Sequence, residues 1–166
     1  KQKRADYVLL HKPNLPIAII EAKDNKHSVG DGMQQGINYA EILDIPFVYS
    51  SNGDGFLEHD IKNGTETEIS LDKFPSPNEL WDRFKNEQQI DDKQEELITE
   101  PYYFKIGDIT PRYYQRIAIN RTVEAVAKGQ DRILLVMATG TGKTYTAFQI
   151  IYRLWKAGIK KKILYL

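Results

Sequence analysis

One short segment constrains the fold more than any other: the glycine-rich run Thr139–Thr144, Thr-Gly-Thr-Gly-Lys-Thr. It follows the apolar run Arg132–Val136, which predicts a buried strand. Lys162–Leu166 is expected to begin another strand. Between them, apolar residues recur at helical spacing and predict a helix with one face formed by Phe148, Ile151, Tyr152 and Trp155. Strand, loop, helix and strand in this order indicate a parallel sheet with a right-handed crossover.

The glycine-rich run has the chemistry of a loop that binds nucleotide phosphates. Its glycines let backbone N–H groups face phosphate oxygens, and the helix N-terminus adds its positive dipole. Lys143 would reach the β- and γ-phosphates of ATP, and the Thr144 hydroxyl would bind the Mg²⁺ of Mg-ATP. The general pattern GxxxxGK[ST] has Gly, or commonly Ala, where this chain has Met137. The alternative is a turn that only caps a helix. The ATP-binding residues expected in this loop are Thr139, Gly140, Thr141, Gly142, Lys143 and Thr144.

A glutamine supports the nucleotide interpretation. Gln115 lies at the start of a helix predicted over residues 112–128, which ends at Gly129, and it precedes Lys143 by 28 residues. A glutamine amide both donates and accepts hydrogen bonds and can therefore select adenine. The alternative for Gln115 is an ordinary surface residue. Residues 102–104 are expected to serve in packing, with one of their rings as a candidate to stack on adenine.

The first 61 residues predict a ββαββ unit. The expected strands are 7–10, 17–20, 47–50 and 56–61, with a turn over 11–16 and a helix over 31–43. If the hairpin folds symmetrically about Pro13 and Asn14, Asp6 faces Glu21 across the ladder. Two like charges there are destabilising unless something neutralises them, and a divalent cation would do so. Period-two alternation places Lys23 on the same face as Glu21.

This geometry predicts a Mg²⁺ site formed by hard oxygen ligands: Asp6, Glu21 and the Ala22 carbonyl. The metal would activate a water and stabilise charge on a phosphate, and Lys23 would orient that water or stabilise the developing charge. Gln35 and Tyr39 lie four residues apart on one face of the next helix. The alternative is a set of surface charges on strand ends. The three histidines, His11, His27 and His59, lack metal-ligand spacing and are expected on the surface.

The net charge of zero is a sum over unlike segments. Residues 1–61 hold 6 basic and 9 acidic side chains, residues 62–100 hold 5 and 11, and residues 101–166 hold 12 and 3. The segment nets are therefore −3, −6 and +9, so neutrality does not exclude a nucleic-acid partner.

The connecting segment and the composition give two further expectations. A helix is expected to begin at Ser76, and residues 86–100 are expected to form a solvated linker or an exposed helix. The absence of cysteine and of any long apolar run fits a cytoplasmic location without a membrane partner.

Two resemblances follow from these motifs. Pro111–Gln115 and Met137–Thr144 resemble the Q-motif and motif I of superfamily 2 helicase motors. Ala5-Asp6 with Glu21-Ala22-Lys23 resembles the PD-(D/E)xK nuclease motif, with Ala where the pattern has Pro. Gln35 and Tyr39 match the Gln-x-x-x-Tyr element of one branch of these nucleases, which implies a role in positioning DNA or the site.

The order of these motifs along the chain, with the nuclease motif before the motor motifs, resembles that of the restriction (R, or HsdR) subunit of type I restriction–modification enzymes. The resemblance implies an α/β chain with a PD-(D/E)xK nuclease-like mixed sheet followed by the beginning of a RecA-like parallel α/β motor domain. The expected divisions are a nuclease core over 1–61 without the family's N-terminal helices, an acidic connector over 62–100, and the motor start over 101–166. It also implies ATP-driven translocation, Mg²⁺-dependent cleavage of unmodified double-stranded DNA, and modification and specificity subunits as partners.

Two other interpretations remain open. One is a superfamily 2 helicase whose degenerate nuclease-like domain serves as a scaffold, and the other is an ATP-binding protein whose N-terminal domain contacts partners. The chain lacks an initial Met and stops within an apolar run, so we expect it to be part of a longer protein. No acidic motor motif follows the loop within the chain, so we expect these residues alone to be inactive as an ATPase.

Overall fold

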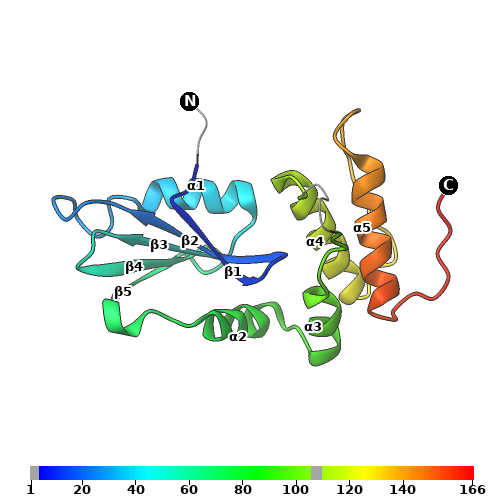
Figure 1. Cartoon of the computed structure of the whole chain (residues 1–166). Coiled ribbons are helices and arrows are strands. Elements are labelled where there is room, and N and C mark those ends of the chain that lie inside the picture. The colour runs from blue at the N-terminus through cyan, green and yellow to red at the C-terminus, as the bar shows by residue number, and fades with distance from the viewer. Residues whose placement is uncertain (1–3, 106–109) are drawn as a thin grey trace. The chain divides into compact units, whose positions relative to one another are not determined.

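The computed structural model describes residues 4–105 and 110–166 of this mixed α/β chain (Figure 1). The chain divides into two compact units, Lys1–Phe84 and Lys85–Leu166. Among the described residues, no helix combines the length and the apolar character needed to cross a bilayer.

The first unit is built on a five-stranded mixed sheet with the strand order β1-β2-β3-β4-β5. Its strands are β1 (Tyr7–Lys12), β2 (Leu15–Ala22), β3 (Phe47–Ser51), β4 (Gly55–Asp60) and β5 (Thr65–Ser70). Only β2 and β3 pair in parallel; the other neighbours are antiparallel. The expected ββαββ order is therefore confirmed. The sheet nevertheless continues beyond residue 61, because β5 adds an edge strand from the segment expected to be a connector.

Helix α1 (Met33–Leu43) covers one side of the sheet (Figure 1). Its apolar side chains pack with those of β2 and β3, and the buried cluster consists of Ile19, Met33, Ala40, Ile45 and Val48. Gly36 allows the helix backbone to approach the sheet, since a Cβ there would lie 2.5 Å from Val48 Cγ1 and 3.3 Å from Glu21 Cγ. The helix ends at Asp44, which adopts the left-handed conformation.

On the other side of the sheet, Phe74 and helix α2 (Pro77–Gln88) contact the strands after the short 3-10 turn η1 (Leu71–Lys73) (Figure 1). The Tyr49 ring contacts the Phe56 and Phe74 rings at centroid distances of 6.2 and 4.7 Å. Arg83 donates to both carboxylate oxygens of Glu58, at 2.9 and 2.6 Å. The helix expected from Ser76 is confirmed, with the Ser76 hydroxyl and the Glu79 backbone N–H 3.2 Å apart at its N-terminus.

Among the described residues of the second unit lie three helices: α3 (Asp92–Thr99), α4 (Tyr113–Ala127) and α5 (Lys143–Lys156). Leu97, Ile119 and Val123 form its buried core, and Ile150 and Leu154 pack against them. The helix expected over 112–128 is thus confirmed, and Gly129 follows it with φ of 81°. Residues 86–100 were expected to be solvated, but α3 has a capping box at Asp91 and buries Leu97 and Ile98.

The two strands expected in the second unit are not formed. Residues 132–136 and 162–166 have no strand pairing in the described structure, and the exposed fractions of Leu134 and Val136 are 86% and 88%. A strand needs neighbours for its backbone N–H and C=O groups, and no described segment pairs with either run. The parallel sheet that these two apolar runs predicted is therefore not formed within the described residues.

The helix α5 forms as expected, but its buried residues are not those of its apolar face, which consists of Phe148, Ile151, Tyr152 and Trp155. The exposed fractions of Phe148 and Trp155 are 45% and 59%. The fully buried positions of α5 are instead Thr146, Gln149 and Arg153. The burial of Gln149 and Arg153 is tolerated because their polar groups find hydrogen-bond partners in neighbouring segments, at Tyr103 and Ile98.

Candidate functional site

The β1–β2 hairpin brings Asp6 and Glu21 together. Tyr7 pairs with Ile20 and Val8 with Ile19, which is the register expected from a symmetrical turn. The backbone N–H of Asp6 donates to Glu21 Oε1 at 3.3 Å. In return, one Asp6 carboxylate oxygen accepts a hydrogen bond from the Ala22 N–H at 3.0 Å. The two carboxyl groups therefore meet where β2 ends.

Glu21 is a fully buried carboxyl group, with an exposed fraction of 0%. Burial raises the pKa of Glu21, and the negative charge of Asp6 raises it further. The Asp6 backbone N–H and the charge of Lys23 act in the opposite direction on this pKa. A carboxyl group in this situation either takes up a proton or gains a positive partner.

Helix α1 supplies an amide to this pair of carboxyl groups. Gln35 Nε2 donates to Glu21 Oε2 at 2.6 Å, so both Glu21 oxygens accept hydrogen bonds. Tyr39 is brought to a different place: its half-buried side chain packs against the apolar cluster beneath α1, as does Ala5. The structure thus joins Gln35, but not Tyr39, to Glu21 by a hydrogen bond.

Lys23 lies beside the start of α1. A Cβ built on Gly32 would be 3.4 Å from Lys23 Cε and 2.9 Å from both Glu21 Cβ and Ser50 Oγ. The Lys23 stem and the Glu21 side chain therefore both pass close to the Gly32 backbone, with room only for glycine there. Gly32 and Ser50 were not found from the sequence, since a single small residue in a loop or a strand has no distinctive pattern.

The oxygen atoms at this place suit a hard cation. Two carboxyl groups of like charge meet there, one of them buried, and both retain acceptor capacity beyond their hydrogen bonds. Within the described part of the chain, no three His, Asp or Glu side chains gather as a ligand set. A cation held here would rely on Asp6 and Glu21 together with backbone and water oxygens. The Ala22 carbonyl remains a predicted ligand.

The second group of candidate residues surrounds the glycine-rich loop. Gly140 and Gly142 have φ of 78° and 84°, the left-handed region that glycine adopts without strain. Helix α5 begins directly after Gly142, as expected. Lys143 Nζ lies 3.4 Å from the Met137 carbonyl and 3.3 Å from the Ala138 carbonyl. The lysine thus contacts the loop's own carbonyl groups, and Thr144 lies exposed at the first turn of α5.

Two side chains make hydrogen bonds that hold the glycine-rich loop: Thr141, within the loop, and Gln115, on α4. The Thr141 hydroxyl donates to the Ala138 carbonyl at 2.6 Å. Gln115 Nε2 donates to the Thr141 carbonyl at 2.9 Å, while Gln115 Oε1 accepts from the Arg112 N–H at the same distance. The Gln115 amide therefore connects the start of α4 to the loop and keeps one N–H for another acceptor. Thr139 lies exposed in the turn before Gly140.

Gln149 is a residue that the sequence did not single out. Its amide donates to the Tyr103 carbonyl at 3.0 Å and accepts from the Tyr103 N–H at 2.9 Å, an arrangement that mimics a strand pair. The Tyr103 ring packs on Phe148 and Tyr152. Tyr103 therefore packs on α5, as expected, although its exposed fraction is 40%. The packing expected for Phe104 is wrong, since its exposed fraction is 67%.

Comparison with known proteins gives two family matches. Residues 1–67 match the model of the type I restriction enzyme R protein N terminus (HSDR_N). Residues 108–166 match the model described as type III restriction enzyme, res subunit. The two matches coincide with the two groups of candidate residues.

Curated relatives and a solved structure cover nearly the whole chain. The type I restriction enzyme EcoAI endonuclease subunit of Escherichia coli is 57% identical over 99% of this chain and 21% of its own length. The EcoKI endonuclease subunit of Escherichia coli strain K12 is 29% identical over 98% of this chain and 17% of its own length. A fragment assigned to an HsdR subunit from Vibrio vulnificus YJ016 has a TM-score of 0.86 and 48% identity, covering 95% of this chain and 29% of that one. The chain thus spans about a fifth of the length of the curated relatives.

Proposed function

Because this chain belongs to the family of R (HsdR) subunits of type I restriction enzymes, we propose that it contributes a nuclease centre and an ATP-binding loop to such an enzyme. The nuclease core is proposed over residues 1–61 and the start of the motor over 101–166. The whole enzyme would translocate on double-stranded DNA by hydrolysing ATP and cleave DNA that lacks the protective modification. Modification and specificity subunits are the proposed partners, and the cytoplasm is the proposed location.

The observation that carries the proposal is the meeting of Asp6, Glu21, Lys23 and Gln35 at the end of one hairpin. Asp6 and Glu21, with the Ala22 carbonyl, are proposed to bind Mg²⁺. When bound, the ion would lower the pKa of a water molecule and stabilise negative charge on the scissile phosphate. Lys23 would orient the attacking water or stabilise that charge from beside Gly32.

The hydrogen bonds around Glu21 suit this role. Gln35 holds one Glu21 oxygen and the Asp6 N–H holds the other, which limits the rotation of the carboxylate. Asp6 is fixed in turn by the Ala22 N–H. Both acids are therefore oriented before DNA arrives, which lowers the cost of reaching a reactive geometry. Tyr39 is proposed to help position DNA or the site.

For the nucleotide, Lys143 is proposed to leave the Met137 and Ala138 carbonyls and to bind the β- and γ-phosphates. The glycines would present backbone N–H groups to the phosphates. Thr144 would bind the Mg²⁺ of Mg-ATP. Gln115 would offer its second N–H to adenine while it keeps its contact with Thr141. These residues alone are expected to hydrolyse no ATP.

The test uses the complete R subunit within the restriction complex, with Asp6→Ala and Lys23→Ala variants. DNA cleavage should vanish in both, while ATP hydrolysis and translocation persist, because the substitutions leave the glycine-rich loop untouched. Plasmid cleavage and ATP hydrolysis are measured on the same preparations. Cleavage that survives in either variant would show that the nuclease assignment is wrong and would favour a scaffolding role for the first unit.

A further inference from the structure

Three consecutive residues at the end of β3 hold the loop that joins β2 to α1. The Lys23 N–H donates to the Ser51 carbonyl at 2.8 Å, at the beginning of the loop. The Asn52 side chain donates to the His27 carbonyl at 2.9 Å, in its middle. The Gly32 N–H donates to Ser50 Oγ at 3.0 Å, at its end. We call these residues the β3 anchor: Ser50, Ser51 and Asn52.

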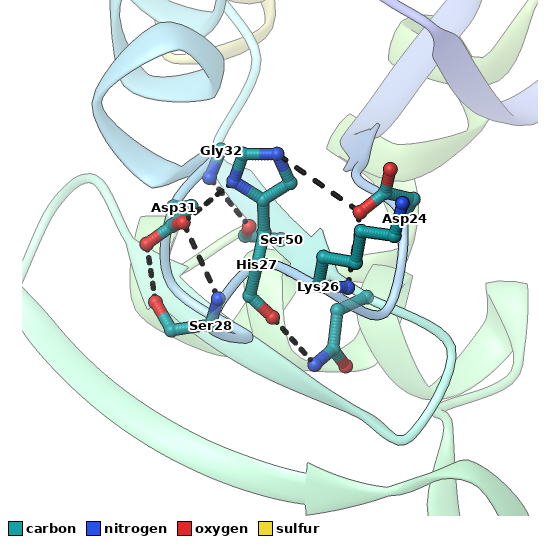
Figure 2. A network of polar contacts seen from close by, with 8 residues as sticks. Asp24, Lys26, His27, Ser28, Asp31, Gly32 and Ser50 are labelled. Carbon is teal, nitrogen blue, oxygen red and sulfur yellow. Dashed lines mark hydrogen bonds and ion pairs between the residues drawn. The ribbon is translucent and has the colours of Figure 1, made fainter.

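Hydrogen bonds between residues of the same loop also hold it together, as Figure 2 shows. His27 Nδ1 lies 2.9 Å from an Asp31 carboxylate oxygen, and Ser28 contacts the same carboxylate through its backbone N–H and its hydroxyl. The Lys26 N–H donates to Asp24 at 3.0 Å. The loop between Lys23 and Gly32 is thus a folded unit tied to β3 at three points, rather than a freely moving connection.

The position of this loop determines where Lys23 and Gln35 lie. Lys23 is the first loop residue, and its stem passes the Gly32 backbone. Gly32 leads directly into α1, which carries Gln35. The Ser50 hydroxyl accepts a hydrogen bond from the Gly32 N–H and so fixes the position of the Gly32 backbone. The Lys23 stem and the Glu21 side chain both lie close to this backbone.

Burial supports a specific role for the anchor. Ser50 is fully buried, and the exposed fraction of Asn52 is 9%. Buried hydroxyl and amide groups cost free energy unless they make hydrogen bonds, and an apolar side chain would avoid that cost. Ser50 also lies next to Glu21 in the parallel register of β2 and β3.

We propose that Ser50 and Asn52 are positioning residues of the nuclease centre: through Gly32 and His27 they hold Lys23 and Gln35 against Glu21. This inference rests on the proposed nuclease function. Neither side chain would touch the metal or the DNA. Their effect would be on the rate of the chemical step and not on the affinity for DNA.

Two substitutions test the proposal in the complete R subunit. Ser50→Ala removes the acceptor for the Gly32 N–H with little change in volume. Asn52→Asp keeps the oxygen that accepts from the Asp54 N–H at 3.0 Å but loses the donor to His27. Ser76→Ala is the matched control, because it removes a serine hydroxyl that lies near a helix-terminal N–H at the start of α2.

The measurements are the cleavage rate at saturating DNA and Mg²⁺, the DNA concentration at half-maximal rate, and ATP hydrolysis. Ser50→Ala and Asn52→Asp should lower the saturating rate by about tenfold to a hundredfold, since small displacements of catalytic groups have effects of this order. Half-saturation and ATP hydrolysis should not change. Ser76→Ala should cleave like the wild type.

The outcomes separate this inference from the proposed function. If Asp6→Ala abolishes cleavage while both anchor variants cleave at the wild-type rate, the positioning role is overturned and the nuclease function stands. If Asp6→Ala still cleaves, the nuclease function itself fails. If Ser76→Ala loses as much cleavage as Ser50→Ala, the anchor acts only through stability, which also overturns the proposal. Should Ser50→Ala not fold, Asn52→Asp provides the test alone.

Discussion

Glu21 lies where its negative charge is least favourable. It is buried, it faces Asp6, and burial raises its pKa more than any other influence does. The Gln35 amide and the Asp6 N–H orient the carboxylate but do not neutralise it. A bound divalent cation would remove this disadvantage, so the free energy of folding and cation binding should be linked at this residue.

We expect Mg²⁺ to stabilise the first unit, and more strongly as the pH rises. The raised pKa means that folded Glu21 holds its proton more tightly than unfolded Glu21 does. Its contribution to stability is therefore present below the unfolded pKa and lost as the pH rises through the folded pKa. Above that range, the ionised carboxylate is free to bind Mg²⁺. Mg²⁺ affinity should correspondingly fall as acid protonates Glu21.

Thermal unfolding with and without Mg²⁺, over about pH 4 to pH 8, checks this. Trp81 fluorescence reports on the first unit, and a Trp155→Phe background removes the signal of the second. Glu21→Gln is the control: it should be insensitive to Mg²⁺ and should lack this part of the pH dependence. An equal response of the wild type and Glu21→Gln to Mg²⁺ would contradict the expectation.

At the scale of secondary structure elements, the sequence predicted β1 to β4 from apolar runs and turns, α1 and α5 from apolar periodicity, and α2 and α4 with the help of residues at their ends. It could not predict β5, because Thr65–Ser70 has only one apolar residue and pairs with β4 through its backbone. It also overpredicted strands, because apolar runs form a sheet only where neighbours exist. The buried face of α5 was missed for a related reason: Gln149 and Arg153 are polar, and tertiary partners decide their burial.

Arg153 gives the clearest prediction at this scale. Its guanidinium donates to the Ile98 carbonyl at 2.6 Å and to Asn120 Oδ1 at 2.8 Å, and it lies over the Tyr102 ring. Burial lowers the pKa of Arg153 to about 10. Arg153→Ala would leave two buried acceptors without this donor and should destabilise the second unit by about 3 kcal/mol.

Urea unfolding followed by circular dichroism measures this loss. The control is Arg121→Ala, which removes an exposed arginine from α4; its guanidinium lies 3.8 Å from Glu124. Exposed ion pairs of this kind contribute about 0–1 kcal/mol. Similar losses in both variants would mean that Arg153 does not bind α3 to α4 as the structure indicates.

At the scale of the whole molecule, the two groups of candidate residues lie in separate units with opposite net charge. The sequence predicted both groups, because each depends on a short motif: Asp6 with Glu21 and Lys23, and the loop before α5. It did not predict the β3 anchor, since hydrogen bonds from Ser50 and Asn52 to distant backbone groups follow from the folded geometry alone.

Lys143→Ala tests how the two units cooperate in the complete enzyme. We expect loss of ATP hydrolysis and translocation, because the loop would lack its phosphate-binding cation. Cleavage remote from the recognition site should be lost with them, while Mg²⁺ still stabilises the first unit as in the wild type. Translocation assays and the Mg²⁺-dependent unfolding described above measure the two effects. Remote cleavage that continues without ATP hydrolysis would contradict this dependence.

The β3 anchor has a consequence for how such an enzyme responds to its surroundings. Its three contacts join uncharged groups: a serine hydroxyl, a carboxamide and backbone amides. Dissolved salt screens attraction between ions, including the attraction of a protein for the DNA polyanion, but leaves such neutral contacts nearly unchanged. Variations in ionic strength should therefore alter how often DNA occupies the first unit, while the spacing of Lys23 and Glu21 stays constant.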